Sequence, residues 1–120
     1  MTKIIFYRSG GSFYGFEEQG HACYNENGDD VLCAALSAMT MLIINTIEVA
    51  YASDVDYDIN EELTRIKVTS KAALAEFEED ECKRYAVSGL FMSYFYQLND
   101  MVEEYYKYLE VDVIDKEYAE

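Results

Sequence analysis

A cysteine and the only histidine of the chain lie close together in the sequence, and these two residue types can act as nucleophile and general base. Asp30 precedes a run rich in Ala, Leu and Met, so we expect a helix that is N-capped by this aspartate. Cys33 would then be the third helical residue, beside free backbone N–H groups and the positive end of the helix dipole, which favour a thiolate. His21 is the one imidazole available to complete its activation.

The helix alone is expected to activate the thiol only modestly, by about 0.3–1 kcal/mol, which is less than one pKa unit. Acidic residues at the helix start oppose ionisation of the thiol, so His21 must approach Cys33 for full activation. Gly20 and Gly28 lie on either side of the intervening loop and permit unusual backbone conformations. We hypothesise that this loop swings His21 toward Cys33 when substrate enters, and that N–H groups at the helix start bind the oxyanion.

The residues themselves leave other interpretations open. Buried cysteines are common in protein cores, and catalytic partners need spatial rather than sequential proximity. His21, Cys23 and Cys33 also form H-x-C-x9-C, a set of three possible zinc ligands, but the usual close pair of cysteines is missing. We therefore rank zinc lower and expect neither a metal nor an organic cofactor.

The first part of the chain is expected to supply a hairpin, a loop and a long helix. Residues rich in strand formers predict two paired strands at 3–7 and 13–16, joined by a glycine turn. The polar stretch 17–30 predicts a long loop, of a kind that is often functional. The following helix, 31–52, is apolar nearly all round, so a sheet, another helix or a partner subunit must cover it on several sides.

The second part of the chain is expected to repeat this order. Alternating apolar residues at 55–59 and 63–68 predict another hairpin, and 72–108 has helical composition, with any break near 79–81. A final strand is expected near 111–114. The order ββαββα(β) predicts an α+β fold, with an antiparallel or mixed sheet that carries two long helices packed on one face.

Composition and charge limit the class of protein. The 120 residues are 51% hydrophobic and 15% aromatic, which predicts one packed domain over residues 1–120. The formal net charge of −15 repels phosphate backbones and anionic membranes, so we expect no direct nucleic-acid ligand. The same charge would attract a basic partner.

The segments of the chain also predict where it acts. The first residues lack the apolar core of a signal peptide, and an odd number of cysteines favours reduced thiols, so we expect a cytoplasmic protein. The charge-free run 31–47 is shorter than the roughly 20 residues of a membrane-spanning helix. We therefore expect a buried helix and no membrane.

The stretch around Cys33 resembles the ribosomal-processing cysteine protease family, Prp, of Firmicutes and their relatives. Members of this family have G-H-A, a variable polar loop, and then G-x-D-[IV]-[VL]-C-A-[AG]-x-S. The matching residues here are Gly20, His21, Ala22, Gly28, Asp30, Val31, Leu32, Cys33, Ala34, Ala35 and Ser37. The resemblance implies that His21 and Cys33 form the catalytic dyad, with Gly20, Gly28, Asp30 and Ser37 as supporting positions.

The resemblance also implies a function. The family removes the N-terminal extension of a large-subunit ribosomal protein, the bacterial protein L-twenty-seven, cuts after an aromatic residue, and is known as a homodimer. We expect a cysteine endopeptidase of ribosome maturation that takes a basic protein substrate with such an extension. The alternative is a non-enzymatic homodimeric interaction or ribosome-assembly module in which Cys33 is a buried structural residue.

Overall fold

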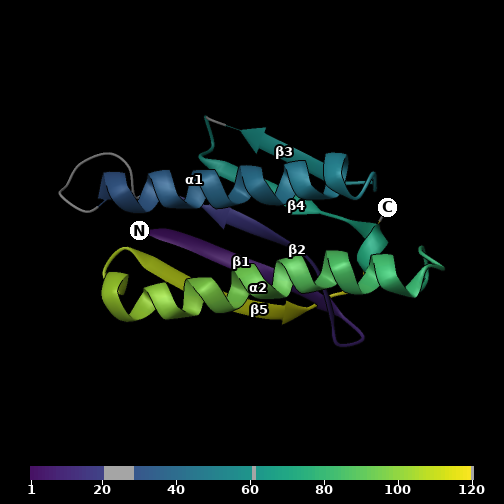
Figure 1. The fold of residues 1–120 in the computed structure, drawn as a ribbon. Coiled ribbons are helices and arrows are strands. Elements are labelled where there is room, and N and C mark those ends of the chain that lie inside the picture. The colour runs from purple at the N-terminus through teal and green to yellow at the C-terminus, as the bar shows by residue number, and fades with distance from the viewer. Residues whose placement is uncertain (21–28, 61, 120) are drawn as a thin grey trace.

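The fold is a five-stranded mixed sheet that carries two long helices on one face (Figure 1). The computed structural model describes residues 1–20, 29–60 and 62–119. The strands are β1 (Thr2–Ser9), β2 (Ser12–Gln19), β3 (Asp56–Asn60), β4 (Arg65–Thr69) and β5 (Leu109–Asp115). The helical segments are α1 (Asp29–Asn45), the π-helical η1 (Thr46–Ala50), the 3-10 helix η2 (Lys71–Ala73) and α2 (Glu81–Tyr105). The predicted α+β class, element order and placement of both helices are confirmed.

The sheet has the strand order β3-β4-β2-β1-β5. Gly10 and Gly11 join β1 to β2 with φ of 57° and 85°, and a tight type I′ hairpin requires positive φ at both of its central residues. The pairs β1 with β2, β2 with β4, and β3 with β4 are antiparallel. The last strand, β5, pairs with β1 in parallel, which makes the sheet mixed.

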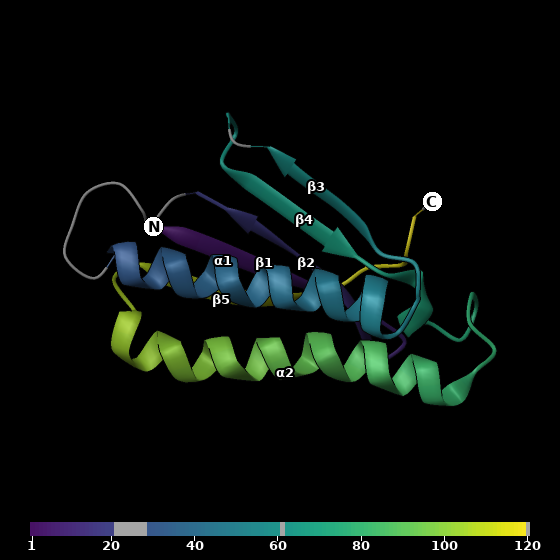
Figure 2. The same ribbon diagram turned by 45° about the horizontal axis from the view of Figure 1, so that its top comes forward.

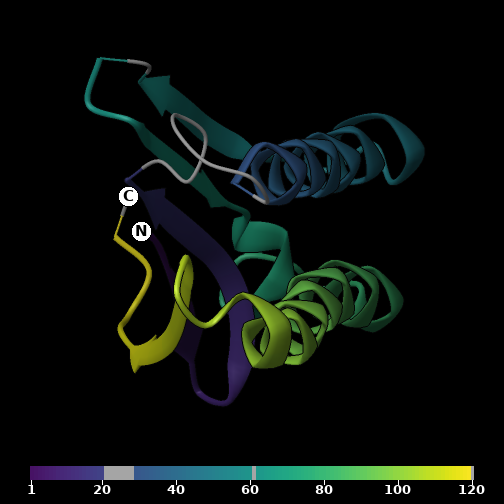
Figure 3. The same cartoon turned by 90° about the vertical axis from the view of Figure 1, so that its left-hand side faces the viewer.

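The core lies between the sheet and the two helices, which are seen end-on in Figure 3. Aromatic rings fill its centre: Phe16 of β2 packs edge-to-face on Tyr94 and Phe91 of α2, with ring centroids 5.0 and 6.0 Å apart. Helices α1 and α2 run side by side above this layer (Figure 2). Helix α2 thus covers the sheet along β2 and β5 and, through Phe6, along β1.

The helix boundaries differ from the predicted ones in two places. Helix α1 begins at Asp29, so Asp30 is its second residue and not the residue that caps it. The segment 72–80 does not continue α2, because Leu74 is extended and Asp80 caps a new helix. The Asp80 carboxylate accepts hydrogen bonds from the backbone N–H groups of Cys82 and Lys83, at 2.9 and 3.3 Å.

Helix α1 is strongly apolar, and the predicted helix 31–52 is divided into α1 and η1. Within α1 and η1, the 20 residues Val31–Ala50 could by length and composition cross a membrane. The expectation that this segment is too short is therefore wrong. However, one side of the segment belongs to the core, where its buried residues are Leu32, Leu36, Thr40, Ile43, Ile44 and Ile47. The core helix of a soluble protein passes the same test, so the length and composition of this segment do not show that it crosses a membrane.

Candidate active site

Cys33 lies near the start of α1, where it is half-buried between the buried Leu32 and the exposed Ala34. Since α1 begins at Asp29, Cys33 is its fifth residue and not its third. The first four N–H groups of a helix have no partner within it, and helical side chains tilt toward the N-terminus. The Cys33 side chain is therefore still directed toward the turn that offers free N–H groups, although its own N–H is not one of them.

The oxidation state of Cys33 differs from the expectation of reduced thiols. Cys33 is disulfide-bonded. Cys82, at the start of α2, is a free and exposed thiol. A thiolate, not a disulfide sulfur, is the nucleophile of cysteine chemistry, so Cys33 must be reduced before it can react with a carbonyl.

The other predicted site residues are distributed between β2 and α1. Gly20 follows the last residue of β2, and Ser37 lies one turn beyond Cys33 on α1, with its side chain exposed. Asp30 belongs to the first turn of α1. His21 and Gly28 lie outside the described residues, so the contact between His21 and Cys33 stays a prediction.

Gly20 has a structural requirement for glycine. Its φ is +84°, a left-handed conformation, and a Cβ atom here would lie 2.4 Å from the carbonyl oxygen of Met1. Its N–H donates a hydrogen bond to the carbonyl oxygen of Thr64, at 3.1 Å. The point at which the chain leaves β2 toward His21 is therefore held by backbone contacts on two sides.

Sequence reasoning missed a buried polar cluster next to this site. Glu18 of β2 accepts hydrogen bonds from the hydroxyl groups of Thr40 on α1 and Tyr94 on α2. Burial raises the pKa of Glu18 to about 7, although the hydrogen bonds from Tyr94 and Thr40 act in the opposite direction. Burial also raises the pKa of Tyr94, and the neighbouring charge of Glu18 adds to this effect. A signal was present in the sequence, because Glu18 shares a strand face with the apolar Phe16.

Glu17, the residue that precedes Glu18 on β2, has its carboxylate on the opposite face of the sheet. Burial acts to raise its pKa, but hydrogen bonds from Tyr7 and Gln19, with the charges of Arg65 and Lys67, hold the pKa of Glu17 below its usual value. The Tyr7 hydroxyl donates to Glu17 at 2.6 Å. The two adjacent carboxyl groups thus have opposite environments, one with cations nearby and one without.

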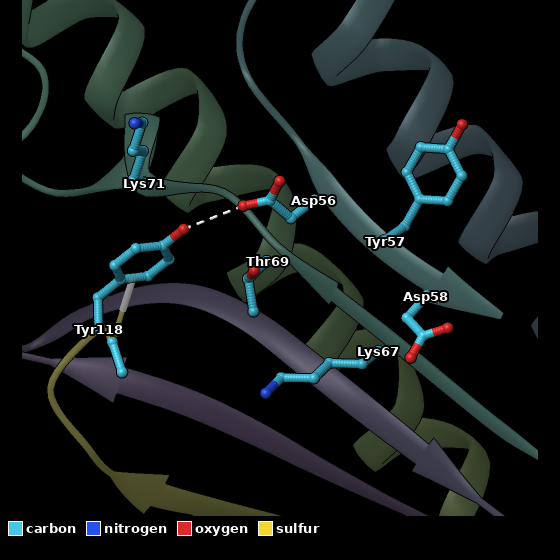
Figure 4. A pocket seen from close by; sticks show the side chains of 8 residues that line it. Asp56, Tyr57, Asp58, Lys67, Thr69, Lys71 and Tyr118 are labelled. Atoms are coloured by element: carbon cyan, nitrogen blue, oxygen red, sulfur yellow. Dashed lines mark hydrogen bonds between the residues drawn. The ribbon is translucent and has the colours of Figure 1, made fainter. Parts of the chain in front are cut away.

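A hollow of about 620 Å³ lies on this helix-free face (Figure 4). Asp56, Asp58, Lys67 and Thr69 line it, and the Tyr118 hydroxyl donates a hydrogen bond to Asp56 across its rim, at 3.0 Å. Since α1 packs on the other face of the sheet, this hollow is separate from the surroundings of Cys33. Within residues 1–20, 29–60 and 62–119, no three His, Cys, Asp or Glu side chains form a group that could hold a metal ion.

The chain matches one family model and several solved structures. Residues 1–110 match the model of the family described as cysteine protease Prp. None of the curated proteins matches the chain. Among solved structures, SMU.848 from Streptococcus mutans superposes with a TM-score of 0.80 and 24% identity, over 97% of this chain and 96% of that one.

Two further structures are of the essential ribosomal processing protease Prp from S. aureus. The complex with a substrate peptide gives a TM-score of 0.76 at 16% identity, and the complex with a covalently linked product peptide gives 0.74 at 17%. Each alignment covers 95% of this chain and 100% of the other. At these identities the likeness establishes the shared fold.

Proposed function

Since this chain belongs to the cysteine protease Prp family, we propose that Cys33 is its nucleophile and His21 its general base. The observation that carries this proposal is the position of Cys33 at the start of α1, next to backbone N–H groups that have no helical partner. In the reduced enzyme, the Cys33 thiolate attacks the scissile carbonyl carbon, and the free N–H groups stabilise the oxyanion. His21 protonates the leaving amine, and water then hydrolyses the thioester.

The remaining motif residues support these two. Gly20 fixes the point at which the segment carrying His21 leaves the sheet, and Gly28 is a permissive point beyond it. Asp30 and Ser37 lie within one turn of Cys33 along α1, where they contribute to its surroundings. The reaction uses neither a metal nor an organic cofactor.

The proposed substrate is a basic protein with an N-terminal extension, and the named candidate is the bacterial ribosomal protein L-twenty-seven. Two solved structures of the same fold, both of the S. aureus protein, are described as a ribosomal processing protease, and one of them includes a substrate peptide. The net charge of −15 supports attraction of a basic substrate. The enzyme is proposed to act in the cytoplasm, where newly made ribosomal proteins are assembled.

We propose that the enzyme is a homodimer that covers the outer side of α1. This side presents many apolar residues to solvent, with the polar Ser37 and Asn45 between them: Val31, Ala34, Ala38, Met41, Leu42 and Val49. Val31 and Leu42 are 63% and 61% exposed, and no charged residue occurs from Val31 to Ile47. A second copy offers the same uncharged row, as an isologous interface requires.

The experiment is cleavage of an extension peptide by the reduced protein, followed by mass spectrometry. Wild type with reductant, and the Cys82→Ala control, should release the extension after an aromatic residue. Without reductant the rate should fall, because Cys33 is disulfide-bonded. Cys33→Ala and His21→Ala should each lower kcat by about three orders of magnitude or more.

Two results would contradict the dyad. The first is cleavage that continues in a folded Cys33→Ala protein. The second is a wild type that is inactive when reduced and whose Cys33 is alkylated no faster than the free Cys82. The second result would favour the alternative, a non-enzymatic homodimeric or ribosome-assembly module with a structural Cys33.

A further inference from the structure

The Glu18 carboxyl group joins three elements of the fold at one oxygen atom. Glu18 of β2 is 6% exposed, Thr40 of α1 is 1% exposed and Tyr94 of α2 is 4% exposed. The Thr40 hydroxyl donates to Oε1 of Glu18 at 3.0 Å, and the Tyr94 hydroxyl donates to the same atom at 2.6 Å. This cluster of three side chains, which we call the Glu18 clamp, lies inside the layer between the sheet and the two helices.

Stability alone does not account for a carboxyl group in this place. No ion pair to Glu18 is present among the described residues, and its flanking partners on the sheet are Ile4 and Ile66. A buried charge without a cation costs free energy, and an apolar side chain of similar volume is often neutral or stabilising instead. The carboxyl group instead fixes the relative orientation of the two helices, because the hydroxyl groups of Thr40 and Tyr94 must both reach one acceptor atom.

The clamp acts on both segments that carry the proposed dyad. Thr40 follows Cys33 by about two helical turns, and seven residues along a helix return to nearly the same face, with a drift of about 20°. On β2, Glu18 lies just before Gly20 and His21. One hydrogen bond thus connects the helix of Cys33 directly to the strand that leads to His21.

We propose that Glu18 is a positioning residue, which holds the rotation of α1 over the end of β2 and thereby sets Cys33 relative to the segment of His21. The inference rests on the proposed function only in taking Cys33 as the reacting thiol. A displacement of about 1 Å between reacting groups costs up to about 100-fold in rate. A small rotation of α1 at Thr40, two helical turns from Cys33, would therefore be enough to lower the rate. The hydrogen bond from Tyr94 holds α2 to the same carboxyl group, so Glu18 fixes the positions of both helices on the sheet.

The state of the clamp depends on pH near neutrality. The group that titrates there is Glu18, whose pKa burial raises to about 7, and the one other titratable group facing it among the described residues is Tyr94. Thr40 from α1 and the flanking Ile4 and Ile66 do not ionise. An ionised carboxylate accepts both hydroxyl hydrogen bonds strongly. The protonated carboxyl group accepts them more weakly, and its own O–H group also needs an acceptor.

The test compares Glu18→Gln with Glu17→Gln. Glu17 is a matched control, because it is the adjacent residue, accepts a 2.6 Å hydrogen bond from Tyr7, and lies on the opposite face of the sheet. The reduced proteins are treated with iodoacetamide across about pH 6 to 8, and peptide mass spectrometry gives the rate at each cysteine. The free Cys82 is the reference thiol in every sample.

For the wild type and Glu17→Gln we expect a step in the Cys33 alkylation rate near pH 7 that Cys82 does not show. Glu18→Gln should lose this step. In cleavage of the extension peptide, Glu18→Gln should lower kcat by about tenfold and change KM by less than about twofold, whereas Glu17→Gln should change neither by more than about twofold. Thr40→Val and Tyr94→Phe each remove a hydrogen bond that lowers the pKa of Glu18, so both should move the Cys33 step to higher pH.

If folded Glu18→Gln and Thr40→Val keep the wild-type Cys33 profile and kcat, the positioning role is wrong. It is also wrong if Glu17→Gln has an equal effect. Should Glu18→Gln fail to fold, Thr40→Val and Tyr94→Phe decide the question by the same two readouts. A Glu18-dependent profile in a protein that cleaves no peptide would overturn the proposed function and leave the clamp intact.

Discussion

At the scale of single residues, the clearest physical effect is the burial of the Glu18 carboxyl group. Burial raises its pKa from 4.5 to about 7, so the folded protein keeps a proton that the unfolded chain has already released. The stabilising contribution of this proton is fully present below about pH 4.5 and is lost as the pH rises through about 7. The difference amounts to about 3 kcal/mol of unfolding free energy across this window.

Glu18→Gln should remove this pH dependence, because an amide does not ionise. In urea unfolding at a series of pH values, the free energy of the variant relative to wild type should rise by about 3 kcal/mol between pH 4.5 and pH 8. Glu17→Gln is the control: the pKa of Glu17 is lowered, so its stabilising contribution is lost only as the pH falls below about 4.5, and this variant should stay nearly constant relative to wild type between pH 4.5 and pH 8. A constant difference between Glu18→Gln and wild type across the range would contradict a raised pKa.

At the scale of elements, the end of β2 is determined by the contact between Gly20 and Met1. Gly11 has nearly the same φ, +85° against +84°, but no atom lies within 4 Å of the Cβ position there. The two glycines therefore separate backbone strain from steric overlap. Both alanine variants would have the backbone strain of a left-handed residue. Only Gly20→Ala would also place its Cβ atom against the carbonyl group of Met1.

We expect Gly11→Ala to lower the free energy of unfolding by about 1–2 kcal/mol, the cost of a left-handed non-glycine residue. Gly20→Ala should cost more than this, because the carbonyl oxygen of Met1 must move as well. Denaturant unfolding of both variants gives the comparison. Equal losses of unfolding free energy in the two variants would mean that the backbone at the end of β2 adapts to a Cβ atom, and that the contact with Met1 does not fix the position of Gly20.

Several elements could be predicted from the sequence because their patterns are local. Alternation and the glycine turn gave both hairpins, and alternation also gave the last strand, since strand periodicity is visible within a few residues. The segment 72–80 has helical composition, but Ala72, Ala73 and Leu74 are buried in a short 3-10 turn, so tertiary packing overrides propensity. The polarity of Glu18 favours a loop, whereas the structure places it in β2 on the face that it shares with Phe16.

The candidate site could be predicted in part. Cys33 at the start of a helix follows from composition, although the helix begins at Asp29 and Asp30 does not cap it. Thr40 and Tyr94 reach Glu18 only through the packing of α1 and α2, which no local pattern contains. The approach of His21 to Cys33 depends on the path of the chain between them and stays a prediction.

At the scale of the whole molecule, charge and apolar surface are separated. The chain carries nine Lys and Arg against 24 Asp and Glu, yet no charged residue occurs from Val31 to Ile47, the run that includes most of α1. Such an exposed apolar row is unusual for a monomer and typical of an interface. The two surfaces together suit a dimer whose remaining surface is acidic.

Leu42→Glu should break the proposed dimer, because two carboxylates would face each other across a symmetric interface. Tyr85→Glu is the control, since Tyr85 is 72% exposed and belongs to the other long helix, α2. Sedimentation equilibrium should show a dimer for wild type and Tyr85→Glu, and a monomer for Leu42→Glu. A wild type that sediments as a monomer would leave the apolar row without this explanation.

The parallel pairing of β1 with β5 has a consequence for how the polypeptide matures during synthesis. Thr2 pairs with Leu109 and Arg8 with Asp115, so β1 meets its outer neighbour only after the other strands and both long helices have been made. Until then β1 keeps one open hydrogen-bonding edge. A nascent enzyme therefore completes its sheet late, and chains stalled before β5 should be captured by chaperones or degraded.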